Sequence, residues 1–376
     1  TPAGVFIYDT GSSPPTPTLT PTATATATPT RTPTPTVSTA VIPTAAPGAW
    51  PTPCALAALA LPAGSHPHGL LVNVTDAHLY AAYHGANRDG RRLGILRINP
   101  LAVEATVELD TVPAGPNAVA RLPRSGTVAG YWVAVTQRET GELVFVDPVT
   151  RAVTARRDVG DQPDGVAVAG DSLYVANYAN DMVSRFDPVT LAGLGEIGVG
   201  HEPSLFAVDP DTGDAYLSLH GANKVARLRG GSVAEEYLEI PEPYSLAFDA
   251  TDRRLYVASR GHHHMVTVLD IAAGSRAGVI PVGGEALLVA VNPDTGHLFV
   301  VVAAGSGRQA EVYSTLDWRR IAVIPLPAGA EEGIAVDSRA GKVYIACGES
   351  DTIAVIQDVA AAEVLFTSDR DGNTEV

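Results

Sequence analysis

The sequence is short of several features that would point to particular classes of protein. Its 376 residues include only 2 Cys and 2 Met, and no apolar run reaches the ~18 residues of a membrane span. Lys and Arg total 25 against 41 Asp and Glu, which gives a net charge of −16. Because phosphate binding needs a basic surface, this balance argues against nucleic acid and anionic membranes as partners. We therefore expect no nucleic-acid partner and no transmembrane segment.

Motifs of common enzyme chemistry are missing as well. The chain has no G-x-S-x-G nucleophile motif, no phosphate-binding loop and no Cys-x-x-Cys pair. It does not begin with Met and shows no signal peptide, so we expect a processed product or a piece of a longer chain.

What the sequence does contain is one unit repeated along most of its length. The clearest copy, Gln162–Asp187, has three strand patterns, and a fourth follows at Leu194–Val199. The aromatic residue of the second strand recurs every 40 to 52 residues, at Tyr80, Trp132, Tyr174, Tyr216, Tyr256, Phe299 and Tyr344. The first strand carries a small residue in six of seven copies, as is needed where strands crowd near an axis: Ala120, Ala167, Ala207, Ala247, Ala290 and Ala335, with Leu71 in the first copy. These repeats predict an all-β, seven-bladed β-propeller with four-stranded antiparallel blades.

A strand pattern before the first copy indicates how the ring closes. Ala55–Leu61 resembles the fourth strands that end other copies, such as Ile321–Gly329, and we predict that it closes blade seven. Cys54 would begin this strand, and Cys347 would end the second strand of the same blade. An extracellular location favours a disulfide between them, whereas the third strand lies between, a gap of about 9–10 Å that exceeds disulfide reach. The sequence leaves their pairing open.

The segments outside the repeats divide the chain into four parts. Residues 1–11 hold an isolated N-terminal strand, residues 12–53 an extended Pro/Thr-rich linker, residues 54–362 the propeller and residues 363–376 a C-terminal strand or hairpin tail. The linker buries too little apolar surface to fold, and its prolines favour polyproline II. Thr beside Pro suits O-glycosylation, and Asn73 begins an N-glycosylation sequon. The candidate glycosylation sites are Thr16, Thr18, Thr22, Thr34, Thr36 and Asn73.

Short motifs in the repeats resemble a known family. Leu173–Asp181, LYVANYAND, resembles the YVTN-repeat propellers, with weaker echoes at Leu255–His264 and Val343–Asp351. The resemblance covers roughly Cys54 to Thr367, and the tail Val364–Val376 is similar to TolB-type propeller repeats. It implies an extracellular or cell-surface protein related to surface-layer components. It implies little about chemistry, because propellers carry many unrelated functions.

The two ends of the chain suggest a mode of assembly. If Ala55–Leu61 closes the ring, the tail strand is surplus, and each end has a strand pattern without a partner. Open edges recruit strands, so the N-terminal strand of one copy would pair with the tail of the next and build a filament or array. The residues of this assembly strand are Val5, Phe6, Ile7, Tyr8, Val364, Leu365 and Phe366. The alternative is that both ends are remnants of adjacent domains.

Eight of the ten histidines are predicted to lie on one face of the propeller. This face, called the top face here, carries the loops that enter each first strand and the loops that join second to third strands. The opposite face receives His78 and His297. Our candidate top-face binding residues are His66, His68, His84, Asp164, His201, His220, Tyr244, His262 and Glu332.

Three functions are compatible with this face. Our principal prediction is a non-enzymatic extracellular surface or matrix scaffold without a cofactor, whose partners are proteins or glycans. One alternative is a metal-assisted lactonase- or lyase-type hydrolase, with a divalent metal and a general base among His66, His68, His201 and Glu332. Some lactonase- and lyase-type propellers, which this chain resembles in fold, place metal and histidine there. The other alternative is a glycan- or peptide-binding module, and histidines that only form local hydrogen bonds remain a simpler explanation.

Overall fold

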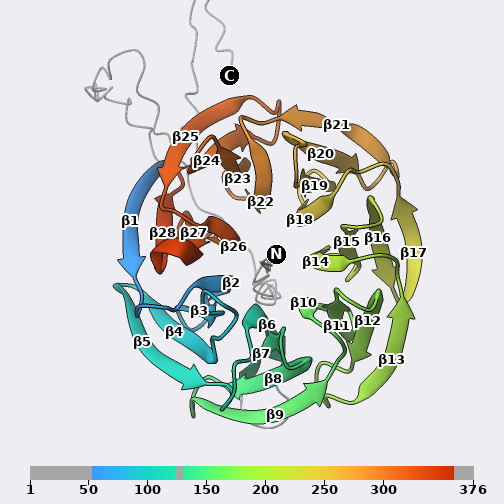
Figure 1. Ribbon diagram of the computed structural model, residues 1–376. Helices are drawn as coiled ribbons and strands as arrows, with labels where there is room; N and C mark the ends of the chain where they lie inside the picture. The colour runs from blue at the N-terminus through green and yellow to red at the C-terminus, as the bar shows by residue number, and fades with distance from the viewer. Residues whose placement is uncertain (1–52, 124–129, 360–376) are drawn as a thin grey trace, which may run out of the picture.

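The computed structural model describes residues 53–123 and 130–359, which form seven four-stranded antiparallel blades around one axis (Figure 1). Blade one contains β2 (Pro67–Asn73), β3 (His78–Tyr83), β4 (Arg92–Ile98) and β5 (Leu101–Glu108). Blade two contains β6 (Pro116–Pro123), β7 (Tyr131–Gln137), β8 (Glu142–Asp147) and β9 (Ala152–Asp158). Blade three contains β10 (Pro163–Ala169), β11 (Ser172–Asn177), β12 (Met182–Phe186) and β13 (Gly193–Gly198). Blades four and five contain β14 (Pro203–Val208), β15 (Ala215–Leu219), β16 (Lys224–Arg229) and β17 (Ser232–Tyr237); and β18 (Pro243–Asp249), β19 (Arg254–Ser259), β20 (Met265–Asp270) and β21 (Ser275–Pro281). Blades six and seven contain β22 (Glu285–Asn292), β23 (His297–Ala304), β24 (Gly307–Ser314) and β25 (Arg320–Leu326); and β26 (Ala330–Asp337), β27 (Lys342–Cys347), β28 (Thr352–Gln357) and β1 (Cys54–Ala60). The predicted fold is confirmed.

The hydrophobic core lies between the blades. Seven clusters of buried residues are present, and each is drawn mainly from two adjacent blades. The repeated aromatics form part of this core, because Tyr80, Tyr216 and Phe299 are at most 1% exposed. Burying one such side chain contributes about 1.5–3 kcal/mol, so the repeat pattern specifies blade packing.

One member of the aromatic repeat is out of register. In the other six blades the aromatic residue pairs with the expected first-strand position, as in Tyr174 with Ala167. In blade two, Ala134 pairs with Ala120, and Trp132 pairs with Leu122 instead. The assignment of Trp132 to the repeat position was therefore wrong. Trp132 lies two residues earlier on the same side of its strand, where it still packs against the core between blades two and three.

The ring closes as predicted. β1 pairs antiparallel with β28 and completes the sheet order β1-β28-β27-β26. The loop after β1 is also tied to blade seven, because the amides of Gly64 and His66 each donate to the Asp351 carboxylate at 2.7 Å. Cys54 lies opposite Gln357 and Cys347 opposite Thr352, at the two ends of β28. Both thiols are free, in agreement with the argument from strand spacing.

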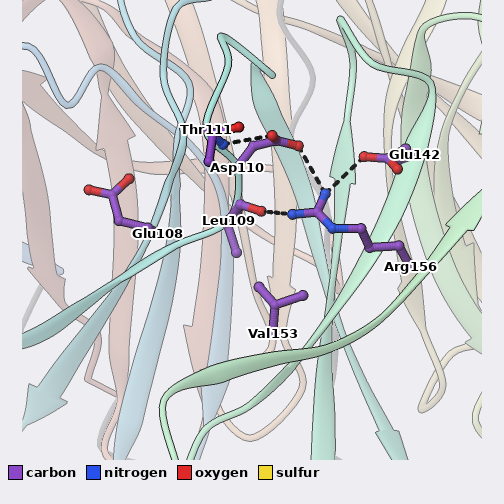
Figure 2. A pocket seen from close by; sticks show the side chains of 7 residues that line it. All are labelled: Glu108, Leu109, Asp110, Thr111, Glu142, Val153 and Arg156. Carbon is purple, nitrogen blue, oxygen red and sulfur yellow. Dashed lines mark hydrogen bonds and ion pairs between the residues drawn. The ribbon is translucent and has the colours of Figure 1, made fainter.

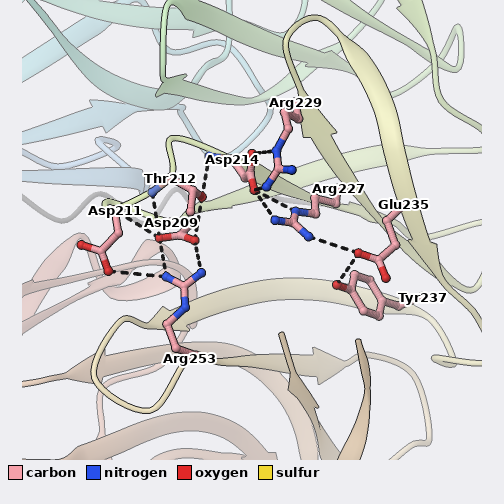
Figure 3. A network of polar contacts seen from close by, with 9 residues as sticks. All are labelled: Asp209, Asp211, Thr212, Asp214, Arg227, Arg229, Glu235, Tyr237 and Arg253. Atoms are coloured by element: carbon pink, nitrogen blue, oxygen red, sulfur yellow. Dashed lines mark hydrogen bonds and ion pairs between the residues drawn. The ribbon is translucent and has the colours of Figure 1, made fainter. Parts of the chain in front are cut away.

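Turns between first and second strands are stabilised by side-chain ion pairs on the face opposite the top (Figure 3). In the turn Asp209–Gly213, the Asp209 carboxylate accepts the amide of Asp211 at 3.0 Å and pairs with Arg253 at 2.5 Å. The following Asp214 pairs with Arg227 at 2.5 Å and with Arg229 at 2.6 Å. Each of these carboxylates is therefore paired with at least one guanidinium group.

Several predicted features fall outside the described residues or conflict with them. The assembly-strand residues, the linker, the tail and the candidate Thr sites lie outside residues 53–123 and 130–359. Asn73 ends β2 with no exposed surface, so its amide is not accessible for glycosylation in the folded protein. Within the described ranges, the one helix is the three-residue turn Gly348–Ser350, and none is long and apolar enough to cross a membrane.

Candidate functional site

The top face is built by pairs of loops that hydrogen-bond to each other. In blades one to five, the amide of the residue that follows the second strand donates to the carbonyl of the residue before the first-strand proline. Examples are His84 to His66 at 3.3 Å and Arg260 to Glu242 at 3.0 Å. The two loop types therefore lie on one face, as the sequence predicted.

Each of these loops uses an unusual backbone conformation to deliver a side chain to the axis. The residue before the proline has positive φ in blades one to five, including His66 (40°), Gln162 (52°) and Glu242 (40°). Positive φ is disfavoured for residues with a side chain and costs on the order of 1 kcal/mol. The proline that follows has a fixed φ, so the side chain of the residue after the proline is directed to the axis in the same way in each of these blades.

Each blade contributes one side chain at this level. It belongs to the first-strand residue three positions before the repeated small residue, which in six blades pairs with the repeated aromatic of the second strand. We call these seven residues the axial ring. All are at most 4% exposed, and six of the seven are polar: His68, Asn117, Asp164, Ser204, Tyr244, Leu287 and Glu332. A core position is usually apolar. Six buried polar side chains on the innermost strands therefore mark the axis as a candidate functional site.

A chain of hydrogen bonds crosses four blades within the axial ring. His68 Nδ1 lies 3.0 Å from Asn117 Oδ1, and Asn117 Nδ2 donates to Asp164 Oδ1 at 3.1 Å. Ser204 Oγ donates to the other Asp164 oxygen at 2.6 Å, and Arg138 forms a buried ion pair with the same carboxylate. This chain holds the inner strands of blades one to four in register.

Close approach of the inner strands makes this chain possible. A Cβ on Gly69 would lie 2.5 Å from the Asn117 carbonyl oxygen, and one on Gly165 would lie 2.3 Å from that of Ser204. Each glycine directly follows an axial-ring residue, so a side chain there would push neighbouring blades apart.

At the other end of this hydrogen-bond chain, His68 faces the carboxyl group of Glu332, and burial shifts the pKa of each towards its neutral form. His68 Nε2 lies 3.7 Å from Glu332 Oε2 and 3.3 Å from His66 Nδ1. Burial, with the stacked ring of His84 at 3.8 Å, holds the pKa of His68 well below its usual range. Burial likewise raises the pKa of Glu332 well above its usual range, against the opposing charge of Arg260. Since His68 Nδ1 lies against an amide oxygen, it is the ring nitrogen that carries the proton, and this leaves Nε2 as an acceptor towards His66 and Glu332.

A second layer of side chains covers the axial ring. It comprises the residue four positions after each aromatic column position, and we call it the upper ring: His84, Arg138, Tyr178, His220, Arg260, Ala303 and Gly348. The Arg138 guanidinium stacks on Tyr178, with its Cζ 5.1 Å from the ring centroid, and Arg260 stacks on Tyr244 at 3.5 Å. Within the described residues, Tyr244 OH, Glu332 Oε2 and Arg260 Nε are buried without hydrogen-bond partners.

The structure brings some of the predicted site residues together and separates others. His66, His68, His84, Asp164 and Glu332 belong to the connected group, and His220 reaches Tyr244 with ring centroids 6.1 Å apart. His201 and His262 do not join it.

His201 points away from the axial ring. Its side chain is 61% exposed, pairs with Glu202 at 3.8 Å and packs over Gly221. His262 is an exposed loop residue. In the described part of the chain, no group of three His, Cys, Asp or Glu side chains is arranged to hold a metal. His201 is therefore not placed beside His66 and His68, and the metal hypothesis stays a prediction.

Four site residues were missed by the sequence reasoning: Asn117, Arg138, Ser204 and Arg260. Apart from Tyr244, the predicted site residues are histidines and acids, and none of these four belongs to either type. Aligning the seven copies and reading the column three residues before the repeated Ala would have found the axial ring.

A pocket on the side of the molecule is a weaker candidate site (Figure 2). It has a volume of about 460 Å³ between the outer strands of blades one and two. Its central Arg156 lies 2.9 Å from both Asp110 and Glu142 and also donates to the Leu109 carbonyl. Because these groups satisfy one another, we interpret the pocket as a structural link between blades.

Comparison with known proteins establishes the fold and leaves the family open. No protein-family model matches the chain, and no curated protein matches it in sequence. Among solved structures, the chain is similar to hydrazine synthase of Kuenenia stuttgartiensis, at 15% identity over 80% of this chain and 97% of that one, with a TM-score of 0.66. It is also similar to virginiamycin B lyase of Staphylococcus aureus, at 12% identity over 81% and 99%, TM-score 0.65. A chain of the mitotic checkpoint complex matches at 12% over 88% and 99%, TM-score 0.68.

These neighbours define the class as a seven-bladed β-propeller. At such identities they establish the fold alone, so the resemblance to YVTN-repeat propellers is confirmed only for the fold.

Proposed function

We propose that this protein is an extracellular binding propeller whose top face recognises a peptide or glycan around the axis. The observation that carries this proposal is the pair of stacked rings, in which buried polar groups remain without partners. A buried donor or acceptor without a partner costs about 1–3 kcal/mol, and such a cost is recovered when a ligand supplies the missing hydrogen bond. The Pro/Thr-rich segment supports the extracellular location.

The test is to screen the full chain against glycan and peptide arrays and to compare two matched histidine variants. His220 lies in the upper ring, and His78 begins β3 at the opposite end of its blade. We expect His220→Ala to weaken a specific hit by at least about tenfold, the effect of roughly 1.4 kcal/mol, and His78→Ala to leave it unchanged. Equal loss in both variants, or no specific hit, would contradict top-face binding.

A second candidate function is a lyase or hydrolase that opens a lactone or similar ring. His68 and Glu332 lie 3.7 Å apart, and burial shifts the pKa of each towards its neutral form, so they are suited to act as base and acid in one reaction. One of the structural neighbours is a lyase. Turnover of a lactone library that is lost in Glu332→Gln but kept in the adjacent Glu331→Gln would support this candidate. Metal analysis of the purified protein would show whether a divalent ion takes part.

Assembly through the terminal strands remains a separate proposal. Its test is light scattering and electron microscopy of the intact chain and of a chain lacking residues 1–10. Filaments that disappear on truncation would support head-to-tail strand addition, and a monomer in both cases would contradict it.

A further inference from the structure

The charges at the axis leave one buried cation without a counter-ion. Arg260 is 7% exposed, and its guanidinium donates to the carbonyl oxygen of Glu331 at 3.1 Å. It forms no ion pair with any carboxylate in the described part of the chain. Taking an ionised group out of water costs several kcal/mol unless it is paired, so this arginine is an exception that calls for an explanation.

The two carboxyl groups nearest in sequence to that carbonyl cannot serve as the missing partner. The Glu331 carboxylate accepts from Arg308 Nε at 3.1 Å and is already neutralised. Glu332 is 2% exposed, its Oε2 has no hydrogen-bond partner among the described residues, and burial raises its pKa well above its usual range. It forms no ion pair with Arg260 in the described part of the chain.

The other charged groups at the axis cancel. Arg138 is the counter-ion of Asp164, and the buried imidazoles of His68 and His84 are neutral near pH 7. Arg260 is therefore a buried guanidinium of the axial site without a paired carboxylate among the described residues, in a protein whose formal net charge is −16.

The surroundings of Arg260 suit a carboxylate. Its Nε is buried without a partner, and the hydroxyl of the stacked Tyr244 is also unpartnered. A guanidinium offers two parallel donors that match the two oxygens of a carboxylate. In blade six, which adjoins the blade of Arg260, both ring positions are apolar, Leu287 and Ala303, so an aliphatic group of a ligand would match them.

We propose that Arg260 is the anion-binding residue of the top face and that the ligand presents a carboxylate to it, with an apolar group next to Leu287. This inference rests on the proposed binding function and narrows its ligand class. A peptide C-terminus and a uronic acid share this chemistry, and the experiment distinguishes between them.

A first measurement needs no ligand. We expect Arg260→Met to raise the melting temperature of the full chain, because it removes an unpaired buried charge while Met still packs on Tyr244. Arg138→Met is the matched control and should lower the melting temperature, because it leaves Asp164 buried without its counter-ion. A lower melting temperature for Arg260→Met would overturn the proposal, since it would mean that the guanidinium is already satisfied in the free protein.

A second measurement uses defined probes. Acetyl-leucine and acetyl-leucinamide represent a peptide terminus with and without its charge, and glucuronate and glucose do the same for a sugar. We expect one acid to bind, its neutral counterpart to bind at least about tenfold more weakly, and the acid's affinity to fall at least about tenfold in Arg260→Ala. Arg88→Ala, which removes a charge from an exposed ion pair on the same face, should bind like the wild type.

The outcomes separate the two proposals. Equal binding of acid and neutral probe, unaffected by Arg260→Ala, would overturn the carboxylate assignment and leave top-face binding intact. No binding of either acid up to about 50 mM, above the millimolar range expected of a few contacts, would also overturn it. Failure of the array screen at the top face would instead overturn the binding function itself.

Discussion

Single residues at the axis have pKa values that are shifted from those of the same side chains in water. Burial is the main physical cause for Glu332, His68 and Tyr244 alike. A shift of one pKa unit corresponds to about 1.4 kcal/mol between protonation states. The axial ring is therefore a place where pH and stability are linked, and the sign of each link can be predicted.

Glu332 is expected to destabilise the fold as pH rises. Its native pKa lies above the ordinary value of 4.5, so above pH 4.5 the unfolded chain loses its proton while the native state keeps it. Glu332→Gln removes this difference and should stabilise the protein by about 1.4 kcal/mol for each pH unit above 4.5, until the native pKa is reached. Urea unfolding at pH 5 and pH 7 measures the effect. Glu331→Gln, paired with Arg308, should show no such gain, and a less stable Glu332→Gln at pH 7 would refute the assignment.

His84 is expected to destabilise the fold as pH falls. Burial lowers its pKa from 6.5 to about 4, so between these values the unfolded chain binds a proton that the native state refuses. The resulting loss is on the order of 3 kcal/mol from pH 6.5 to pH 4. His84→Gln should flatten the stability profile by that amount, while His201→Gln, on a side chain 61% exposed, should leave it unchanged. An unchanged slope in His84→Gln would show that the imidazole titrates normally.

At the scale of elements, the turns on the face opposite the top face depend on buried carboxylates. Asp214 follows the turn between β14 and β15, with its side chain 1% exposed. Burial alone would raise its pKa, but hydrogen bonds from Arg229 and Arg227 outweigh burial and lower the pKa to about 2.

Loss of this carboxylate should be measurable. The depressed pKa contributes about 2 kcal/mol above pH 4, which disappears as pH falls from 3.8 towards 2. Asp214→Asn should therefore destabilise the protein by at least about 2 kcal/mol at pH 7 in urea unfolding, and by less at pH 3. Asp211→Asn, in the same turn but with a side chain 67% exposed, should change stability by less than about 0.5 kcal/mol. Equal effects of the two substitutions would contradict this role.

The sequence was informative about elements wherever a side chain served the core. Blade number and ring closure followed from the aromatic repeat and from the misplaced fourth strand, because burial between blades restricts these positions. Blade two shows the limit of this signal. There Ala134 occupies the position of the repeated aromatic and Trp132 stands two residues earlier, on the same side of the strand. Spacing alone could not detect that shift.

The axial site was less predictable for a physical reason. Five of its seven members share a backbone position created by a left-handed residue and a proline, and the seven do not share a side-chain type. Their contacts join residues of different blades that are about 40 to 50 positions apart in the sequence. His68 and Asn117, for example, are 49 positions apart. No local pattern shows which side chains will meet across such distances, so Arg260 and Asn117 could be recognised only once the ring was assembled.

At the scale of the whole molecule, the ring is closed at a single junction, where β1 completes blade seven. β1 is almost wholly exposed, and a groove of about 430 Å³ lined by Leu56, Leu326 and their neighbours runs beside it. What holds β1 is its pairing with β28. Open propellers expose a strand edge, whereas this pairing leaves the edge covered.

Removing β1 should weaken the entire ring. A chain that begins at Pro62 lacks the strand and should melt roughly 5–10 °C below a chain that begins at Pro53 and keeps it. Differential scanning calorimetry of the two chains makes the comparison. Identical melting temperatures would mean that blade seven is stable with three strands and that closure has another basis.

The closing strand also has a consequence for the order of events during synthesis. Gly64 and Asp351 are 287 residues apart in the chain yet hydrogen-bonded in the finished ring. At about 5–20 residues per second, a ribosome needs roughly 15–60 s to make that interval. During this time β1 has been made but its partner β28 has not. Its sequence, CALAALA, is rich in Ala, a residue of weak strand preference. Such a segment has little tendency to pair with a wrong strand, so it can stay unpaired until blade seven is complete.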